Sequence, residues 1–201
     1  MTQDREQWIA TTHDWKDDLD VGHLRFIRER SGDYGRGGRR HQILEVAAYA
    51  NDEAEAQGRT GLLVVTVRAD GWVSVADDGR GTDTRLDAEG RVVRKPVMAT
   101  RDLRFFDDPA PPLLPDGLPR RGMSTVAALS SQLIHENHRA EGSWAQRYRH
   151  GIPEDGLSRI AGRGATGTTV AFLSEAGDPL DLTPEDLTAF PWLTIRWVQE
   201  G

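Results

Sequence analysis

Four ionisable side chains lie at helical spacing in residues 39–57. Glu45, Tyr49 and Glu53 follow one another at intervals of four residues, with Asp52 beside them, so they form one stripe on the predicted helix. A carboxylate and a phenol one turn apart suit acid–base chemistry, in which one group takes a proton and the other gives one. Acidic groups also occur on solvent-exposed helix faces that have no function. This helix by itself leaves both interpretations open.

A second group of candidate residues follows an alternating apolar run, in the stretch VSVADDGRGTD at residues 73–83. Asp77 stands at the predicted end of a strand, where an ionised carboxylate can accept hydrogen bonds from a ligand. Gly79 and Gly81 have no side chains, so a ligand can approach the backbone closely there. An Asp-Gly pair after a strand is also common in simple turns. The stretch is therefore either a turn or one wall of a binding site.

Composition excludes several kinds of catalytic site. The chain contains no cysteine, which excludes disulfides, thiolate nucleophiles and cysteine zinc sites. Lys16 and Lys95 are its only lysines, so Schiff-base chemistry and a Walker-type phosphate loop have almost no candidates. His135 and His138 lie three residues apart on a predicted helix, but no third ligand has suitable spacing. We therefore predict no metal site.

The net charge of −7 argues against direct binding to nucleic acid, because neutralising phosphates requires clustered Lys and Arg. A local exception is the segment 25–40, which contains six arginines and ends in a glycine-rich stretch. This segment either frames an anionic pocket or contacts a polyanion. No apolar run is long enough to span a membrane, and the N-terminus lacks the pattern of a signal peptide, so we expect a cytoplasmic protein.

A mixed set of predicted helices and strands positions these residues. The strongest helix covers residues 39–57 and ends at Gly58. Residues 61–70 and 71–78 alternate in polarity around an Asp-Gly pair, which predicts a hairpin. Further strands are predicted at residues 142–151, 167–175 and 192–198. Further helices are predicted at residues 95–106, 122–137 and 182–190, the last with Thr183 as its N-cap.

Helices mixed with adjacent hairpin strands are typical of an α+β sandwich, a mostly antiparallel sheet with helices on one face. The length of 201 residues fits one such domain at residues 21–201, preceded by an N-terminal arm at residues 1–20 that docks by Trp8 and Trp15. Residues 82–121 contain six prolines and no clear periodicity, which is typical of a functional loop or lid.

The order and spacing of these segments resemble the ATPase domain of the B subunits of bacterial DNA gyrase and topoisomerase IV. Residues 23–58 resemble a family loop, R-x-R-P-G-M-Y-I-G, followed by an E-V-V-D-N-x-x-D-E-A helix. VSVADDGRGTD resembles V-x-D-D-G-R-G-I-P, GLPRRGMSTVAALS resembles G-L-H-G-V-G-x-S-V-V-N-A-L-S, and GTTVAFLSE resembles the closing G-T-x-V-x-F. The resemblance implies the GHKL (Bergerat) ATPase-type fold, an α/β sandwich with a mixed, mostly antiparallel sheet.

The resemblance also assigns roles in a nucleotide pocket. Asp77 takes the place of the aspartate that accepts a hydrogen bond from the adenine amino group, and Thr168 shares a water with it. Glu45 takes the place of the glutamate that deprotonates the attacking water. Arg80 is expected to pair with Glu53 at the pocket edge. The other positions assigned to ligand binding are Val46, Val75, Gly79, Gly81, Thr82, Arg120, Arg121, Gly122 and Val170.

Departures from the family pattern are concentrated where phosphates and magnesium bind. Tyr49 stands in place of the asparagine that holds magnesium, and a phenol is a poor ligand for this cation. Pro119, Arg120 and Arg121 replace histidine, glycine and valine, which removes an amide donor and disfavours a backbone cradle for phosphate. Residues 82–83, Thr and Asp, replace Ile-Pro and make that wall of the slot more polar.

Three functions stay open. The first is a gyrase-B-like domain that has lost Mg-dependent ATP hydrolysis and holds another small molecule. It is then either a specialised-metabolism catalyst, with Glu45 and Tyr49 as acid–base groups, or an antibiotic-binding self-resistance protein. The second is a working ATPase with ATP and magnesium as cofactors, and the third is a non-catalytic interaction module. Because Asp77, Arg80 and Thr168 are retained while the phosphate-side groups are lost, we favour the first and expect no cofactor. The sequence does not determine the ligand or the oligomeric state.

Overall fold

Eight strands form one mixed sheet in the computed structural model of this chain, in the order β10-β1-β2-β9-β5-β6-β7, with β8 paired to β6. The structure describes residues 19–82, 85–86, 92–93, 96–154, 156–177 and 182–201. The strands of the sheet are β1 Gly61–Arg68, β2 Val73–Asp77, β5 Ser130–Arg139, β6 Gly142–Arg149, β7 Ile152–Pro153, β8 Ser158–Ile160, β9 Gly167–Ser174 and β10 Leu193–Glu200. β1 and β10 run parallel, and the other pairs in the sheet are antiparallel. The predicted α+β fold with a mostly antiparallel sheet is confirmed.

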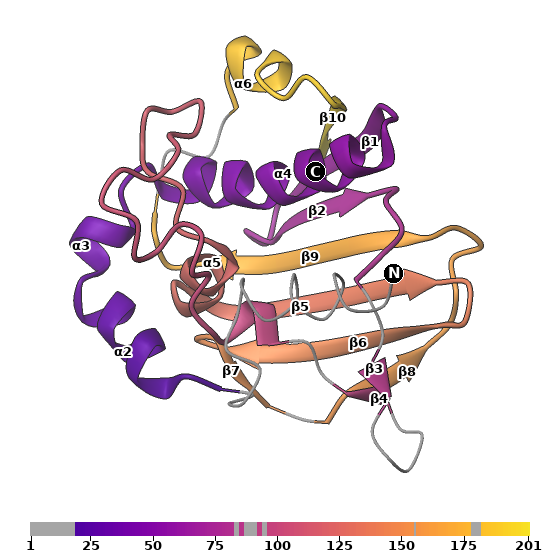
Figure 1. Ribbon diagram of the computed structural model, residues 1–201, viewed down its shortest axis with the longest axis horizontal. Helices are drawn as coiled ribbons and strands as arrows, with labels where there is room; N and C mark the ends of the chain where they lie inside the picture. Colours follow the sequence, from indigo (N-terminus) through magenta and orange to yellow (C-terminus); the bar gives the residue numbers. More distant parts are fainter. Residues whose placement is uncertain (1–18, 83–84, 87–91, 94–95, 155, 178–181) are drawn as a thin grey trace.

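Helix α4, Gly38–Gln57, runs along β1 and β2 and supplies much of the core (Figure 1). Alternate residues of β1 are buried, and Leu63 and Val65 share one hydrophobic cluster with Ile43 and Leu44 of α4. The remaining elements are α2 Val21–Glu29, α3 Ser31–Tyr34, β3 Arg85–Leu86, β4 Val92–Val93, η1 Pro96–Met98, α5 Met123–Ala128 and α6 Pro184–Thr188. The sheet and α4 thus form the two layers between which the candidate site residues lie.

Several local predictions are confirmed. Helix α4 ends at Gln57, and Gly58 caps it in the left-handed conformation, with φ of 64°. β1 and β2 form the predicted antiparallel hairpin, in which Gly71 takes a φ of 88° at the Asp-Gly turn. Thr183 caps α6, and its side chain and that of Asp186 bond to each other's backbone amides. Short-range turn and cap chemistry therefore determines these boundaries.

Two helix predictions are wrong. Residues 122–137 contain only the short helix α5 before the chain enters β5, because β5 pairs with β9 on one side and β6 on the other. Such long-range pairing overrides the helical propensity of a short segment. In residues 95–106, the described helical structure is limited to η1, and the Asp102 carbonyl instead accepts hydrogen bonds from the amides of Phe105 and Phe106 in turns.

This correction also changes the interpretation of His135 and His138, which were predicted to lie on a helix. His135 and His138 lie on β5, where residues three apart face opposite sides of the sheet, so they do not form half of a metal site. The Nδ1 of His138 lies 2.9 Å from the hydroxyl of Ser143. The arginine-rich segment 25–40 forms the end of α2, all of α3 and the start of α4. Trp8 and Trp15 of the predicted arm lie outside the described residues.

Candidate functional site

Asp77, the last residue of β2, has one carboxylate oxygen engaged and one without a partner. Its Oδ1 accepts hydrogen bonds from the backbone amides of Gly79 at 2.8 Å and Thr168 at 3.1 Å. Within the described residues, neither its Oδ2 nor the hydroxyl of Thr168 has a hydrogen-bond partner. Burial raises the pKa of the Asp77 carboxyl above its usual range, and the two amides oppose this effect. Asp77 is thus a positioned carboxylate with a lone acceptor for a ligand.

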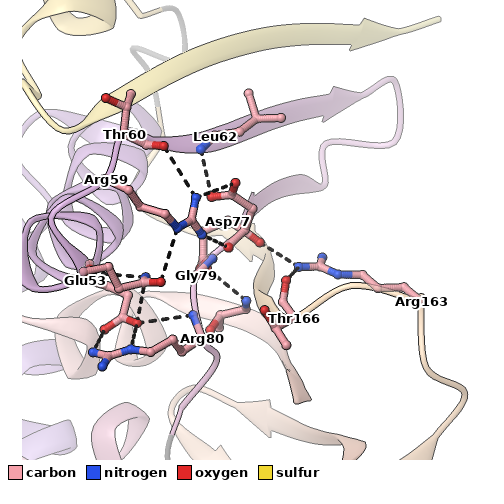
Figure 2. A network of polar contacts seen from close by, with 12 residues as sticks. Glu53, Arg59, Thr60, Leu62, Asp77, Gly79, Arg80, Arg163 and Thr166 are labelled. Carbon is pink, nitrogen blue, oxygen red and sulfur yellow. Dashed lines mark hydrogen bonds and ion pairs between the residues drawn. The ribbon is translucent and has the colours of Figure 1, made fainter. Parts of the chain in front are cut away.

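Glu53 of α4 fastens the loop that follows Asp77. Its two carboxylate oxygens bond to the Arg80 guanidinium at 2.7 and 3.0 Å, and one of them also accepts from the Arg80 backbone amide at 3.2 Å (Figure 2). The pairing expected from the sequence is present. Gly79 lies too close for a side chain, because an added Cβ would stand 2.9 Å from both the Asp77 carboxylate and the Glu53 side chain. The bonds between Glu53 and Arg80 and the close packing of Gly79 hold the backbone of this turn near the pocket.

Two further residues of this wall were not predicted. Arg163 reaches from the β8–β9 connection, and its Nη2 donates to the carbonyl oxygens of Asp77 at 2.6 Å and Thr166 at 3.0 Å (Figure 2). Asn137 of β5 bonds with both side-chain atoms to the backbone of Thr82, at 2.8 and 2.9 Å. Gly81 packs so tightly here that an added Cβ would stand 2.6 Å from Asn137. Glycines on both sides of Arg163 were the one sequence signal of a close approach at this point.

The apolar positions assigned to the slot come from three elements that the fold brings together. Val75 of β2 and Val170 of β9 are direct partners across the sheet. Val46 of α4 belongs to the same buried cluster. The structure therefore places Val75 and Val170 side by side, on the strand that Asp77 ends and its neighbour, and Val46 in the same core.

The phosphate side is arranged differently, because both oxygens of Glu45 already accept hydrogen bonds. The backbone amide of Arg121 donates to Oε1, and that of Gly122 donates to Oε2 at 3.2 Å. The side chain of His41 lies 3.7 Å from Oε1. Glu45 is fully buried, and burial raises the pKa of its carboxyl above the usual range. The segment that resembles a phosphate-binding lid is thus fastened to the position that the resemblance assigns to the catalytic glutamate.

Tyr49 is separated from Glu45 by this same segment. The Tyr49 hydroxyl donates to Asp102 Oδ2 at 2.6 Å, and burial together with Asp102 raises the pKa of the phenol well above its usual value. Gly122 has a φ of 98°, and an added Cβ would stand 3.1 Å from the Tyr49 hydroxyl. Gly122 therefore lies close to both members of the expected acid–base pair.

A cluster of arginine, aspartate and aromatic side chains surrounds Tyr49. The Arg120 guanidinium stands 4.6 Å from the centre of the Tyr49 ring and 4.1 Å from that of Phe105, and it bonds to Asp52 at 2.8 Å. Arg104 forms a two-point ion pair with Asp102 at 2.8 and 3.0 Å, which, with the Tyr49 hydroxyl, holds the pKa of that carboxyl below its usual range although burial alone would raise it. Within the cluster, the positive charges of Arg104 and Arg120 balance the negative charges of Asp52 and Asp102.

This cluster does not fit a magnesium ion. Tyr49 offers a phenol whose proton is already donated, and the neighbouring carboxylates are bound to guanidinium groups, which would repel a divalent cation. In the part of the chain that the structure describes, no group of three His, Cys, Asp or Glu residues has the arrangement of a metal site. None of the described helices is long and apolar enough to cross a membrane.

Relatives of the chain are found among the B subunits of type II topoisomerases, although no protein-family model matches it. The DNA gyrase B protein of Mycobacterium tuberculosis H37Ra is 36% identical over 156 residues, or 76% of this chain and 23% of that protein. The DNA gyrase B protein of Micrococcus luteus is 34% identical over 83% of this chain and 24% of its own. The DNA topoisomerase 4 B protein of Staphylococcus epidermidis is 30% identical over 74% and 23%. The chain is homologous to the ATPase domain of these B subunits.

The homology covers one part of the gyrase B and topoisomerase IV B proteins. The chain spans 22–24% of the length of the curated relatives that it matches. A solved structure of the topoisomerase IV ATP-binding domain of Francisella tularensis, in complex with a small-molecule inhibitor, has a TM-score of 0.57 at 24% identity, over 80% of this chain and 81% of that chain. The predicted GHKL fold is confirmed. The residues of the gyrase-B-like motifs have defined positions in this fold.

Proposed function

We propose that this gyrase-B-like domain binds a planar small molecule at the base side of its pocket and does not hydrolyse ATP with magnesium. The observation that carries the proposal is the lone Oδ2 of Asp77, which has no hydrogen-bond partner within the described residues and lies beside a wall of buried valines. A ligand with a ring and an N–H donor satisfies both features. Apolar walls with a few fixed polar groups are typical of small-molecule sites.

Loss of ATP hydrolysis is supported by the arrangement of the phosphate side. Phosphoryl transfer depends on a metal ion and on amide donors that stabilise the charge of the transferred group. Here the amides of Arg121 and Gly122 donate to Glu45, and Arg120 lies between Tyr49 and Phe105. Binding a triphosphate requires these contacts to break.

Between the two roles considered for such a domain, binding is favoured over catalysis. Glu45 accepts two backbone amides and Tyr49 donates to Asp102, so neither group faces the other across open space. A catalyst needs its acid and its base within hydrogen-bond reach of the substrate. We therefore favour a ligand-binding or antibiotic-sequestering protein, and we do not assign DNA supercoiling to this chain.

Calorimetry on the full chain tests the proposal. The ligands are adenosine, ATP, a non-hydrolysable ATP analogue and an aminocoumarin, each with and without magnesium, and phosphate release is measured in parallel. We expect adenosine or the aminocoumarin to bind independently of magnesium, and ATP to bind no more tightly than adenosine. Magnesium-dependent binding of ATP with phosphate release contradicts the proposal, and so does binding of none of these ligands.

A matched pair of variants assigns the binding to Asp77. Asp77→Asn replaces the lone oxygen by an NH₂ group and is expected to weaken binding about tenfold, because one hydrogen bond to a charged group is lost. Asp78→Asn is the control, since Asp78 pairs with Arg59 at 3.1 Å and is half exposed. Equal affinities of the two variants would show that the ligand does not use Asp77.

A further inference from the structure

The arginine-rich segment of residues 25–40 forms one wall of a second cavity. This cavity has a volume of about 350 Å³ and lies between α2, α3 and the start of α4 on one side and residues 118–121 on the other. Neither Asp77 nor Thr168 contributes to its lining. The cavity is therefore separate from the base-side pocket.

The charge of this cavity is positive and not balanced by its own wall. Arg30, Arg36 and Arg121 line it, and none of them forms an ion pair within the described residues. Asp33 is the one carboxylate among its lining residues. His41, at the inner end, is held by Asp116 at 2.8 Å. Three guanidinium groups around a concave surface attract an anion, because the low-dielectric walls strengthen their combined field.

The same wall presents aromatic rings. The Arg30 guanidinium lies 3.9 Å from the centre of the Phe26 ring, and Phe26 keeps 37% of its surface exposed. Tyr34 stacks on Phe106 with ring centres 5.5 Å apart, and the Arg121 guanidinium lies 6.0 Å above the Tyr34 ring. Guanidinium planes beside rings suit a flat group with a negative substituent, because a planar guanidinium pairs with two oxygens at once.

We propose that this cavity is a second ligand site, which binds an aromatic anion whose carboxylate or phosphate is held by Arg30, Arg36 and Arg121. The ring of the ligand packs against Phe26 and Tyr34. Arg121 contributes its side chain to this cavity and its backbone amide to Glu45, so it connects the cavity to the phosphate side of the first pocket. This second site does not depend on the function proposed for Asp77.

Titration of the full chain with phenyl phosphate tests this site, with inorganic phosphate and phenol as partial ligands. NMR shifts of backbone amides in residues 26–41 and 118–121 report where each compound binds. We expect phenyl phosphate to bind most tightly, inorganic phosphate more weakly and phenol not at all. Inorganic phosphate binding as tightly as phenyl phosphate would overturn the aromatic part of the inference.

Substitutions separate the cavity from general attraction to a basic surface. Arg36→Gln and Arg121→Gln are each expected to weaken phenyl phosphate binding about tenfold, because one charge-assisted contact is lost. Arg28→Gln is the control, since Arg28 lies exposed on α2, outside the cavity lining. Arg36→Lys keeps the charge and is expected to give an intermediate affinity. Equal affinities of the Arg28, Arg36 and Arg121 variants would overturn the proposal. Unchanged phenyl phosphate binding in Asp77→Asn is the expected sign that the two sites are distinct.

Discussion

At the base side of the pocket, Asp77 accepts both of its backbone hydrogen bonds at one oxygen and keeps the other without a partner among the described residues. At the phosphate side, Glu45 uses each oxygen for a different backbone amide. Both carboxyl groups have pKa values raised by burial. Glu45 is fully buried and Asp77 is partly exposed, so the two carboxyl groups differ both in hydrogen-bond satisfaction and in solvent exposure.

One end of a pocket can thus keep its binding capacity while the other end closes. A carboxylate oxygen that no protein group uses is available to a hydrogen-bond donor of a ligand. A fully satisfied network gains nothing from a ligand that must first break it. The side chains of Arg120 and Tyr49 complete such a network at the phosphate side.

Isosteric amide substitutions test the difference between Glu45 and Asp77 most directly. Glu45→Gln must turn an NH₂ group toward a backbone donor, so we expect it to lower the free energy of unfolding by about 2 kcal/mol. Asp77→Asn keeps Oδ1 for both amides and places its NH₂ where no partner is lost, so its cost is expected to stay below about 0.5 kcal/mol. Urea denaturation of both variants measures the difference. Equal costs would show that the two carboxyl groups are held in equivalent ways.

The pH dependence of stability provides a second test, because the pKa values of Asp77 and Asp102 are displaced in opposite directions. The raised pKa of Asp77 means that its contribution to stability is full below the ordinary value of 3.8 and is lost as the pH rises through the folded value. The lowered pKa of Asp102 means that its contribution is full above 3.8 and is lost as the pH falls through the folded value. Each unit of displacement corresponds to about 1.4 kcal/mol.

Carboxyl NMR titrations check both directions, and urea denaturation of Asp77→Asn and Asp102→Asn across pH 2–7 checks the linkage. The stability difference between wild type and Asp102→Asn should grow with pH in this acidic range. The corresponding difference for Asp77→Asn should shrink with pH. Titration of both carboxyls on the same side of 3.8 would contradict the assigned environments.

The smallest effects are expected for two ion pairs, Glu53–Arg80 at the base side of the pocket and Asp52–Arg120 at the phosphate side. Arg80 keeps 60% of its side chain exposed, so a double-mutant cycle with Glu53 is expected to give a coupling of about 0.5 kcal/mol that decreases with salt. The Arg120 side chain is only 9% exposed, so its coupling to Asp52 should be larger and less sensitive to salt. A larger coupling energy for Glu53–Arg80 than for Asp52–Arg120 would contradict this expectation.

Much of the base-side wall was predictable because its residues are close in sequence. Val75, Asp77, Gly79 and Gly81 fall within one strand and its turn, where alternation and the Asp-Gly signal are strong. The Glu53–Arg80 pair followed from the resemblance to the gyrase B family, and the structure contains it. Arg163 and Asn137 were not predicted, because they are distant in sequence and reach this wall from the β8–β9 connection and from β5.

The phosphate side was predictable in composition but not in arrangement. Tyr49, Arg120 and Arg121 were recognised as departures from the family pattern. That Arg120 lies between Tyr49 and Phe105, and that the Arg121 and Gly122 amides donate to Glu45, depends on how residues 99–122 fold back on α4. The wrong helix at residues 122–137 has the same origin, because β5 forms only by pairing with two distant strands.

Helix α4 with its glycine stop, the β1–β2 hairpin, the capped α6 and the GHKL fold class could all be predicted from the amino-acid sequence. These depend on contacts between residues a few positions apart and on an ordered set of motifs. Which buried polar groups have hydrogen-bond partners could be learned only from the folded structure. That outcome depends on side chains from distant segments meeting at one place, and hydrogen-bond satisfaction is a property of the completed packing.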